Sequence, residues 1–264
     1  MKKILNFHQF ILEKEERDDF YKKELNTSFW KKINDDLPDD SGAENYEFDQ
    51  SIRKKLLEIA EGFYESLKFE APIKDIQLTG SLANYNWTDK SDLDVHVLID
   101  FTDIDDNIDL VKKATNGLRF IWNIRNNIKM RGYDVELYLQ DVNEPHTASG
   151  LFSLLNNKWI RIPKYNPPEI DYRDVDEKFQ GIVSDILEME NLMNTSDFSS
   201  VTEIELYNHA KEVKSKIMKM RQEGLSREGE FSVENLAFKK LRNEGYIEKI
   251  IDFISKAYAN IYNE

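Results

Sequence analysis

Two short segments of this chain alternate regularly between polar and apolar side chains. They are residues 92–99, with the sequence DLDVHVLI, and residues 133–139, with the sequence YDVELYL. Side chains of a β-strand point alternately to opposite faces of its sheet, so each segment is expected to form a strand with one polar and one apolar face. The alternation therefore predicts a sheet from which the acidic side chains project together.

The acidic side chains of the two strands are expected to converge. Asp92 and Asp94 share a face of the first strand, and Asp134 and Glu136 share a face of the second. A neighbouring strand can therefore bring a third carboxylate to the first two. Clustered carboxylates repel one another unless a cation neutralises them, and ligation by oxygen alone suits Mg²⁺. Two such ions about 3.5–4 Å apart can hold an attacking hydroxyl, an α-phosphate and a leaving pyrophosphate in line.

Gly80 and Ser81 are separated by ten residues from this acidic pair, and they follow residues 76–79, which we expect to form a short strand. A glycine at a strand end lets the backbone approach a triphosphate. Ser81 is expected to cap a short helix over residues 82–85, whose free N–H groups would face the phosphates. The serine hydroxyl would add one more donor.

Longer apolar patterns predict the elements around these strands. Apolar residues recur at helical spacing over residues 50–68 and again over residues 105–130. The runs at residues 150–155 and 159–162 are separated by a polar trio, which predicts a hairpin that extends the same sheet. We expect an α/β (α+β) fold built on a mixed sheet.

Prolines mark a boundary in the second half of the chain. Pro163, Pro167 and Pro168 punctuate it, and everything after Tyr172 has a helical pattern that only Gly224 and Gly229 break. We therefore expect three parts, which are an N-terminal arm with one or two short helices (residues 1–48), an α/β domain (residues 49–168) and a helical domain (residues 169–264).

Composition limits the chemistry further. The chain has no cysteine, which excludes disulfides, thiolate metal sites and cysteine nucleophiles, and it gives no support to an oxidising compartment, so we expect a cytoplasmic location. A formal net charge of −14 argues against wholesale binding of a polyanion, although basic residues gather at residues 119–131 and 211–221. No segment approaches the roughly 20 apolar residues of a membrane helix, so we expect no membrane partner.

The order and spacing of these motifs resemble the DNA polymerase β-like nucleotidyltransferase superfamily over residues 50–165. That family carries an apolar residue, Gly, then Gly or Ser, a gap of about this length, an Asp-apolar-Asp/Glu-apolar motif and a third acid on a later strand; Thr79 stands where an apolar residue is usual. The resemblance implies that Asp92 and Asp94 hold both metal ions and that the third acid binds the ion that activates the acceptor hydroxyl. Glu136 is our choice for that acid, with Asp134 as the alternative.

The C-terminal part looks like the helical domain that follows the catalytic core in antibiotic adenylyltransferases and signalling-nucleotide synthases. The overall layout is similar to stand-alone nucleotidyltransferases predicted in large tailed phages. A lysine of the helical domain holds the β- or γ-phosphate in related enzymes, so Lys214 is our candidate for that contact, and a solvated helix face is the alternative interpretation. The basic residues of this helix are Lys211, Lys214, Lys216, Lys219 and Arg221.

Four other side chains have two interpretations each. His96 shares the acidic face, and it either touches substrate or is a hydrogen-bonded histidine of the core or rim. His146 either lines the acceptor side or is an exposed loop residue. Tyr85 and Trp87 either stack on a base or pack as core.

The resemblance implies an enzyme that moves a nucleoside monophosphate from an NTP, such as ATP, to a hydroxyl group and releases pyrophosphate. It implies two Mg²⁺ ions, for which Mn²⁺ can substitute. A small molecule, a nucleotide, a protein side chain and an RNA end all stay open as the acceptor, and the acidic composition favours a small or cationic one. The alternative is a catalytically silent nucleotide-binding or interaction module with the same fold. Base preference and oligomeric state stay open.

Overall fold

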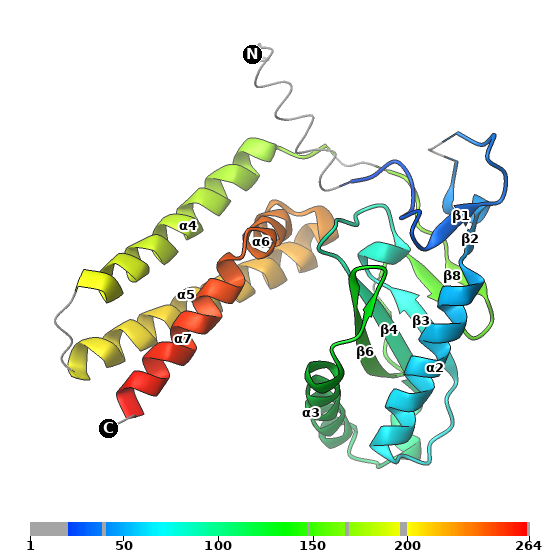
Figure 1. The fold of residues 1–264 in the computed structure, drawn as a ribbon, viewed down its shortest axis with the longest axis horizontal. Helices are drawn as coiled ribbons and strands as arrows, with labels where there is room; N and C mark the ends of the chain where they lie inside the picture. Colours follow the sequence, from blue (N-terminus) through cyan, green and yellow to red (C-terminus); the bar gives the residue numbers. More distant parts are fainter. Residues whose placement is uncertain (1–20, 39–40, 147, 167–168, 196–199, 263–264) are drawn as a thin grey trace, which may run out of the picture. The chain divides into compact units, whose positions relative to one another are not determined.

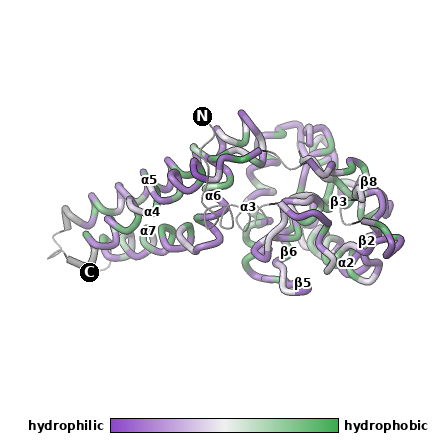
Figure 2. Tube along the Cα trace, turned by 90° about the horizontal axis from the view of Figure 1, so that it is seen from above, coloured by the Kyte–Doolittle hydropathy of each residue, from purple (hydrophilic) through white to green (hydrophobic). Residues whose placement is uncertain are grey.

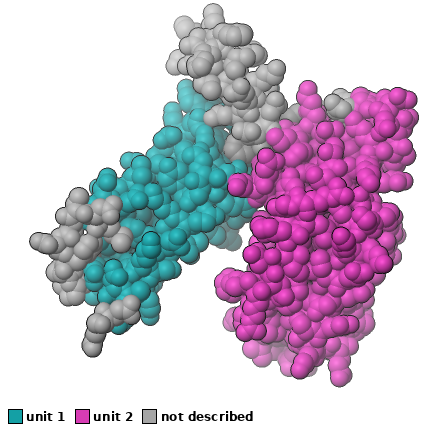
Figure 3. All heavy atoms as spheres, viewed as in Figure 1, with its two compact units in different colours: residues 1–16, 168–264 teal, residues 17–167 magenta. Residues whose placement is uncertain are grey.

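The computed structural model describes residues 21–38, 41–146, 148–166, 169–195 and 200–262. The chain divides into two compact units, one within residues 17–167 and one within residues 168–264 (Figure 3). The first combines a sheet with helices and the second is helical, so the fold class is α+β as expected. None of the described helices combines the length and apolarity that crossing a bilayer requires.

Within the described residues, the α/β unit is built on a mixed sheet with the strand order β5-β6-β4-β3-β7-β8 (Figure 1). β4 and β6 run parallel, and all other neighbouring strands run antiparallel. Helix α3 (Ile108–Asn126) connects the two parallel strands. The strands are β3 (Asp75–Thr79), β4 (Asp92–Ile99), β5 (Lys129–Met130), β6 (Tyr133–Asp141), β7 (Leu151–Ser153) and β8 (Lys158–Arg161).

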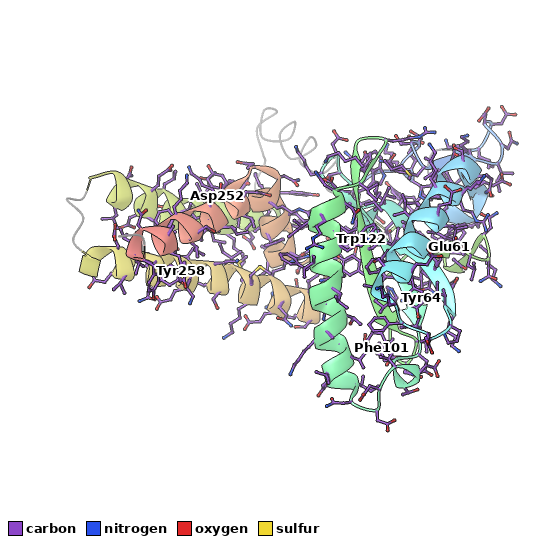
Figure 4. The ribbon with its side chains drawn as sticks, turned by 60° about the horizontal axis from the view of Figure 1, so that its bottom comes forward. Glu61, Tyr64, Phe101, Trp122, Asp252 and Tyr258 are labelled. Carbon is purple, nitrogen blue, oxygen red and sulfur yellow. The ribbon has the colours of Figure 1, made fainter. Side chains whose placement is uncertain are left out.

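The predicted alternation is confirmed in both parallel strands. The odd-numbered residues of β4, from Leu93 to Ile99, are buried, and the even-numbered ones from Asp92 are half-buried. Helix α2 (Gln50–Leu67) packs on β4, and α3 packs on β6. The two helices meet where the ring of Trp122 on α3 lies 5.2 Å from that of Phe63 on α2; Figure 4 labels Trp122. One face of the sheet is therefore core, and the opposite face carries the acids.

An asparagine fixes α3 against the margin of the sheet. The side-chain amide of Asn123 donates to the carbonyl of Leu137 and accepts from its N–H, both at 3.1 Å. Leu137 pairs with Val95 of β4 and lies beyond the two residues of β6 that pair with β5, so its backbone N–H and C=O are directed to α3 at that margin. The helix therefore extends past the sheet, which leaves part of its surface exposed within this unit.

The expectation of a separate N-terminal arm is wrong for residues 21–48, although a short 3₁₀ helix forms at Ala43–Asn45. This segment forms two short antiparallel strands, β1 (Trp30–Lys32) and β2 (Tyr46–Phe48), and it belongs to the α/β unit. The cause is an aromatic cluster, in which Trp30 stacks on Trp159 with ring centroids 4.6 Å apart and packs edge-on against Phe152. Residues 1–20 of the expected arm lie outside the described residues.

The predicted hairpin at the other side of the sheet is confirmed. β7 pairs with β3 and with β8, and Asn157 adopts a left-handed conformation in the turn between them. Gly150, just before β7, approaches the chain closely, since a Cβ there would lie 1.9 Å from the carbonyl oxygen of Ala83. The loop after β3 is thereby held against the start of this hairpin.

The second unit contains the amphipathic helices α4 (Tyr172–Thr195), α5 (Ser200–Glu228), α6 (Val233–Asn243) and α7 (Tyr246–Tyr262). Figure 2 shows hydrophilic and hydrophobic residues alternating along these helices. Gly229 follows α5 with a positive φ, as the predicted break requires, but Gly224 lies inside the helix. A Cβ at Gly224 would lie 2.6 Å from the Cβ of Glu234, so this glycine allows close packing.

Candidate functional site

The parallel register of β4 and β6 places four carboxylates side by side on the polar face. Asp92 lies opposite Asp134, and Asp94 lies opposite Glu136. On the other side of β4, Thr79 at the end of β3 lies opposite Asp94. Each of the two candidate third acids, Glu136 and Asp134, therefore has its own acidic neighbour across the strands.

Lys129 distinguishes these two acids. It lies opposite Asp134 on β5, and its Nζ contacts the Asp134 carboxylate at 2.6 Å. No such cation contacts Glu136 among the described residues. The charge of Asp134 is therefore already balanced at the end of the strand, which favours Glu136 as the third acid.

Glu136 is held by the next residue on its face. The hydroxyl of Tyr138 donates a 2.6 Å hydrogen bond to Oε2 of Glu136. Burial, followed by the charges of Asp94 and Glu136, raises the pKa of Tyr138, so its phenol keeps its proton and remains a donor. The ring of Tyr138 in turn stacks on His96, with centroids 4.6 Å apart.

His96 belongs to this supporting network. Nδ1 of His96 lies 2.6 Å from Oε1 of Gln140, and burial lowers the pKa of the imidazole to about 4. This matches the interpretation of His96 as a hydrogen-bonded histidine. The interpretation of His146 as an exposed loop residue is wrong, because this side chain is half-buried with its ring 5.4 Å from that of His96.

Gly80 has no room for a side chain. It adopts φ 73° and ψ −161°, a region that only glycine enters readily. A Cβ at this position would lie 2.0 Å from Oδ2 of Asp94. The second acid of the pair therefore lies directly against the backbone at the end of β3, as a shared site for metal and triphosphate requires.

The expected capping role of Ser81 is wrong. Residues Ser81–Ala83 form a single 3₁₀ turn in which Gly80 is the N-cap, with no side-chain capping bond. The hydroxyl of Ser81 instead lies 2.7 Å from that of Ser91, directly before β4. Ser81 stands one position too late to be the cap, and its hydroxyl links the two ends of the loop between β3 and β4.

The aromatic residues of this loop support the packing interpretation. Tyr85 is fully buried, and the indole N–H of Trp87 donates to the carbonyl of Glu24 at 3.0 Å. The backbone N–H of Lys22 donates to the carbonyl of Tyr85 at 2.6 Å. The N-terminal segment therefore braces the loop that carries Gly80.

The expected basic contact, Lys214, is an exposed residue of α5 in the helical unit. A denser basic group, formed by Lys239, Arg221 and Arg242, lies in the same unit and was not predicted from the sequence. Burial and then the charges of Arg242 and Arg221, against the opposing charge of Glu230, lower the pKa of Lys239 to about 8. Arg221 also stacks over Phe238, with its guanidinium carbon 4.2 Å from the ring centroid. The run Lys239-Lys240-Leu241-Arg242 was the available signal.

A groove of about 450 Å³ opens beside the acids and lies wholly within the α/β unit. Sequence reasoning missed it, because it forms between the acidic face and the part of α3 that extends past the sheet. Its lining residues are Asp92, Arg119, Phe120, Asn123, Ile124, Asn127, Ile128, Asp134, Val135 and Glu136.

The donor set suits Mg²⁺ by its chemistry. Asp92, Asp94 and Glu136 offer only carboxylate oxygens from neighbouring strands, which is the ligand type that this hard cation prefers. Within the described part of the chain, no three carboxylates or imidazoles already converge on one point. The Tyr138 hydroxyl bonds Oε2 of Glu136, which leaves Oε1 of the same carboxylate as the oxygen that a cation would bind.

Comparison with known proteins assigns no family. No protein-family model, curated protein or solved structure matches the chain. The residues of the site therefore carry the functional assignment.

Proposed function

We propose that this protein is a Mg²⁺-dependent nucleotidyltransferase of the DNA polymerase β-like superfamily. It would transfer a nucleoside monophosphate from an NTP, such as ATP, to a hydroxyl acceptor. The observation that carries the proposal is the register of β3, β4 and β6, which sets Asp94 between Gly80 and Glu136. A glycine in a conformation closed to other residues, an acidic pair and a third acid on the neighbouring strand together support this chemistry.

The roles follow from position. Asp92, Asp94 and Glu136 would hold the cations, and the Gly80–Ser81 backbone would approach the triphosphate. When bound, Mg²⁺, or Mn²⁺ in its place, supplies positive charge at the phosphates and lowers the pKa of the acceptor hydroxyl. The acceptor oxygen loses its proton and forms a bond to the α-phosphorus, while the bond from that phosphorus to the bridging oxygen breaks and pyrophosphate leaves with the electron pair.

The helical unit would supply a phosphate contact. Lys214 on α5 is our candidate for this contact, because a lysine of the helical domain holds the β- or γ-phosphate in the enzymes that the chain resembles. A cytoplasmic location is part of the proposal, because the chain contains no cysteine that an oxidising compartment could pair.

The test is pyrophosphate release. Full-length protein is incubated with each of the four NTPs, Mg²⁺ and a panel of hydroxyl acceptors, and the products are identified by mass spectrometry. Asp92→Asn should abolish release, whereas Asp89→Asn, which alters an exposed carboxylate three residues earlier, should not. Binding of NTP without release in any combination would favour a silent nucleotide-binding module, and absence of NTP binding would reject the enzyme and leave only an interaction module.

A further inference from the structure

The groove beside Glu136 has one acidic and one mixed wall. β4 and β6 contribute Asp92, Asp134 and Glu136, and the second half of α3 contributes the opposite wall. A volume of about 450 Å³ lies in the range of sites for small organic ligands. Under the proposed function, the NTP approaches from Gly80 on the other side of β4, so this groove is free for a second substrate.

The helical wall presents apolar side chains that the core does not use. Trp122 packs inward against Phe63, and at about 100° per residue, Phe120 and Ile124 lie on roughly the opposite side of the helix. Their exposed fractions are 64% and 62%. Because both line the groove, they offer a surface against which a flat ring can stack.

Arg119 supplies positive charge beside that surface. Its guanidinium carbon lies 4.1 Å from the ring centroid of Tyr138. With the other described residues, Arg119 makes no ion pair or hydrogen bond, and its Nε is buried without a partner. Stacking on an aromatic ring leaves the N–H groups at the edge of the guanidinium, where they match the oxygens of a phosphate.

The acidic wall, the exposed apolar side chains of α3 and Arg119 together favour one class of acceptor. The acids of the opposite wall are assigned to cations, so Arg119 remains as the charge available to the second substrate. A cationic amino alcohol would bring like charge to Arg119, and a neutral sugar would leave the apolar wall unused. We propose that the groove binds a nucleotide as the acceptor, with its base against Phe120 and Ile124, its phosphate at Arg119 and its hydroxyl toward Glu136. This inference rests on the proposed function.

The test separates the phosphate from the base by calorimetry. The full chain is titrated with the four nucleoside 5′-monophosphates and the matching nucleosides, in Mg²⁺ and an excess of α,β-methylene NTPs that fill the donor site without turnover. Monophosphates should bind about tenfold or more tightly than nucleosides, the scale of a hydrogen bond to a charged group.

Two variants divide the contributions. Arg119→Gln should reduce monophosphate affinity to that of the nucleosides and leave nucleoside affinity unchanged, with exposed Lys113→Gln on the same helix as control. Phe120→Ala should weaken both ligands about tenfold, the scale of base stacking on an aromatic ring, with exposed Leu110→Ala as control. Thermal melts check that each variant is folded.

Three results would overturn the inference: nucleosides binding as tightly as monophosphates, unchanged monophosphate affinity in Arg119→Gln, or tighter binding of an amino alcohol than of any nucleotide. Each leaves pyrophosphate release by the wild-type protein as a separate observation. If release fails while monophosphates bind as described, the proposed function is wrong and the groove remains a nucleotide site.

Discussion

Tyr138 and Glu136 are joined by a 2.6 Å hydrogen bond along one face of β6, in which the phenol donates to the carboxylate. Tyr138 is itself held in place by two contacts of its ring. The centroid of that ring lies 4.6 Å from the ring centroid of His96 on β4 and 4.1 Å from the guanidinium carbon of Arg119 on α3. The orientation of Glu136, which we propose as the third acid, is therefore set by a residue two positions along the same strand.

Tyr138→Phe should lower turnover about tenfold and raise the Mg²⁺ concentration for half-maximal rate, because Glu136 loses the bond that orients it. The measurement is pyrophosphate release across a Mg²⁺ titration. Tyr133→Phe on the same strand is the control, since it removes a hydroxyl that accepts from Asn26 rather than one that touches an acid. Equal Mg²⁺ dependence in the two variants would assign Tyr138 a structural role only.

Glu136→Gln should abolish transfer while NTP and Mg²⁺ binding survives, and Asp134→Asn should retain most of the activity. The difference arises because Lys129 already balances Asp134. That pair is exposed, so its loss should cost no more than about 1 kcal/mol of stability. Single-turnover rates and calorimetric NTP binding would check both statements, and the reverse order of activities would make Asp134 the third ligand.

Gly80→Ala should abolish transfer and destabilise the fold by about 1–3 kcal/mol, because alanine is strained in this backbone region and its Cβ would displace the Asp94 carboxylate. Gly132→Ala is the matched control, since Gly132 also has a positive φ but would place its Cβ in open space. Urea unfolding and pyrophosphate release together separate backbone strain from loss of the site. Retained transfer in Gly80→Ala would show that Asp94 does not need this position.

Low pH should weaken the N-terminal cap of α2, which is Asp49. Hydrogen bonds from the Ser51 hydroxyl and Lys31, with further bonds from the N–H groups of Ile52 and Ser51, lower the pKa of Asp49 well below its ordinary value of 3.8. The folded state thus binds fewer protons than the unfolded state below about pH 4. The stabilisation is complete above that range and is lost progressively as the pH falls through and below it.

The variant Asp49→Asn tests whether the stabilisation by Asp49 is lost as the pH falls. Asparagine caps a helix about as well as aspartate, so the variant loses the charge contacts to Lys31 and Arg131 and keeps the cap. It should be roughly 1 kcal/mol less stable than wild type at pH 7, and the gap should narrow at pH 3. A gap that widens in acid would contradict the assignment.

Local pattern predicted those parts of the fold that depend on neighbours in the chain. Alternation was sufficient for the two acidic strands, because burial on one face imposes a period of two. The pairing of Asp92 with Asp134 could not be predicted from the sequence, because the alternation within each strand does not determine the register between the two strands. The N-terminal strands could not be predicted for a similar reason, because Trp30 packs on Trp159, which lies far along the chain. The predicted capping role of Ser81 is wrong for a different reason, because the cap of the 3₁₀ turn lies one position earlier, at Gly80.

The amide of Asn123 has a consequence for how this protein behaves at high concentration. Beyond the residues that pair with β5, β6 has no further strand beside it within the described residues, and such margins invite the strands of other molecules. One carboxamide from α3 takes up both hydrogen-bonding groups of Leu137, as a peptide unit of another strand would. The strand that carries Glu136 can thus lie near the border of the sheet, with this carboxylate lining an open groove, while the N–H and C=O of Leu137 are already bonded and are not offered to a strand of another molecule.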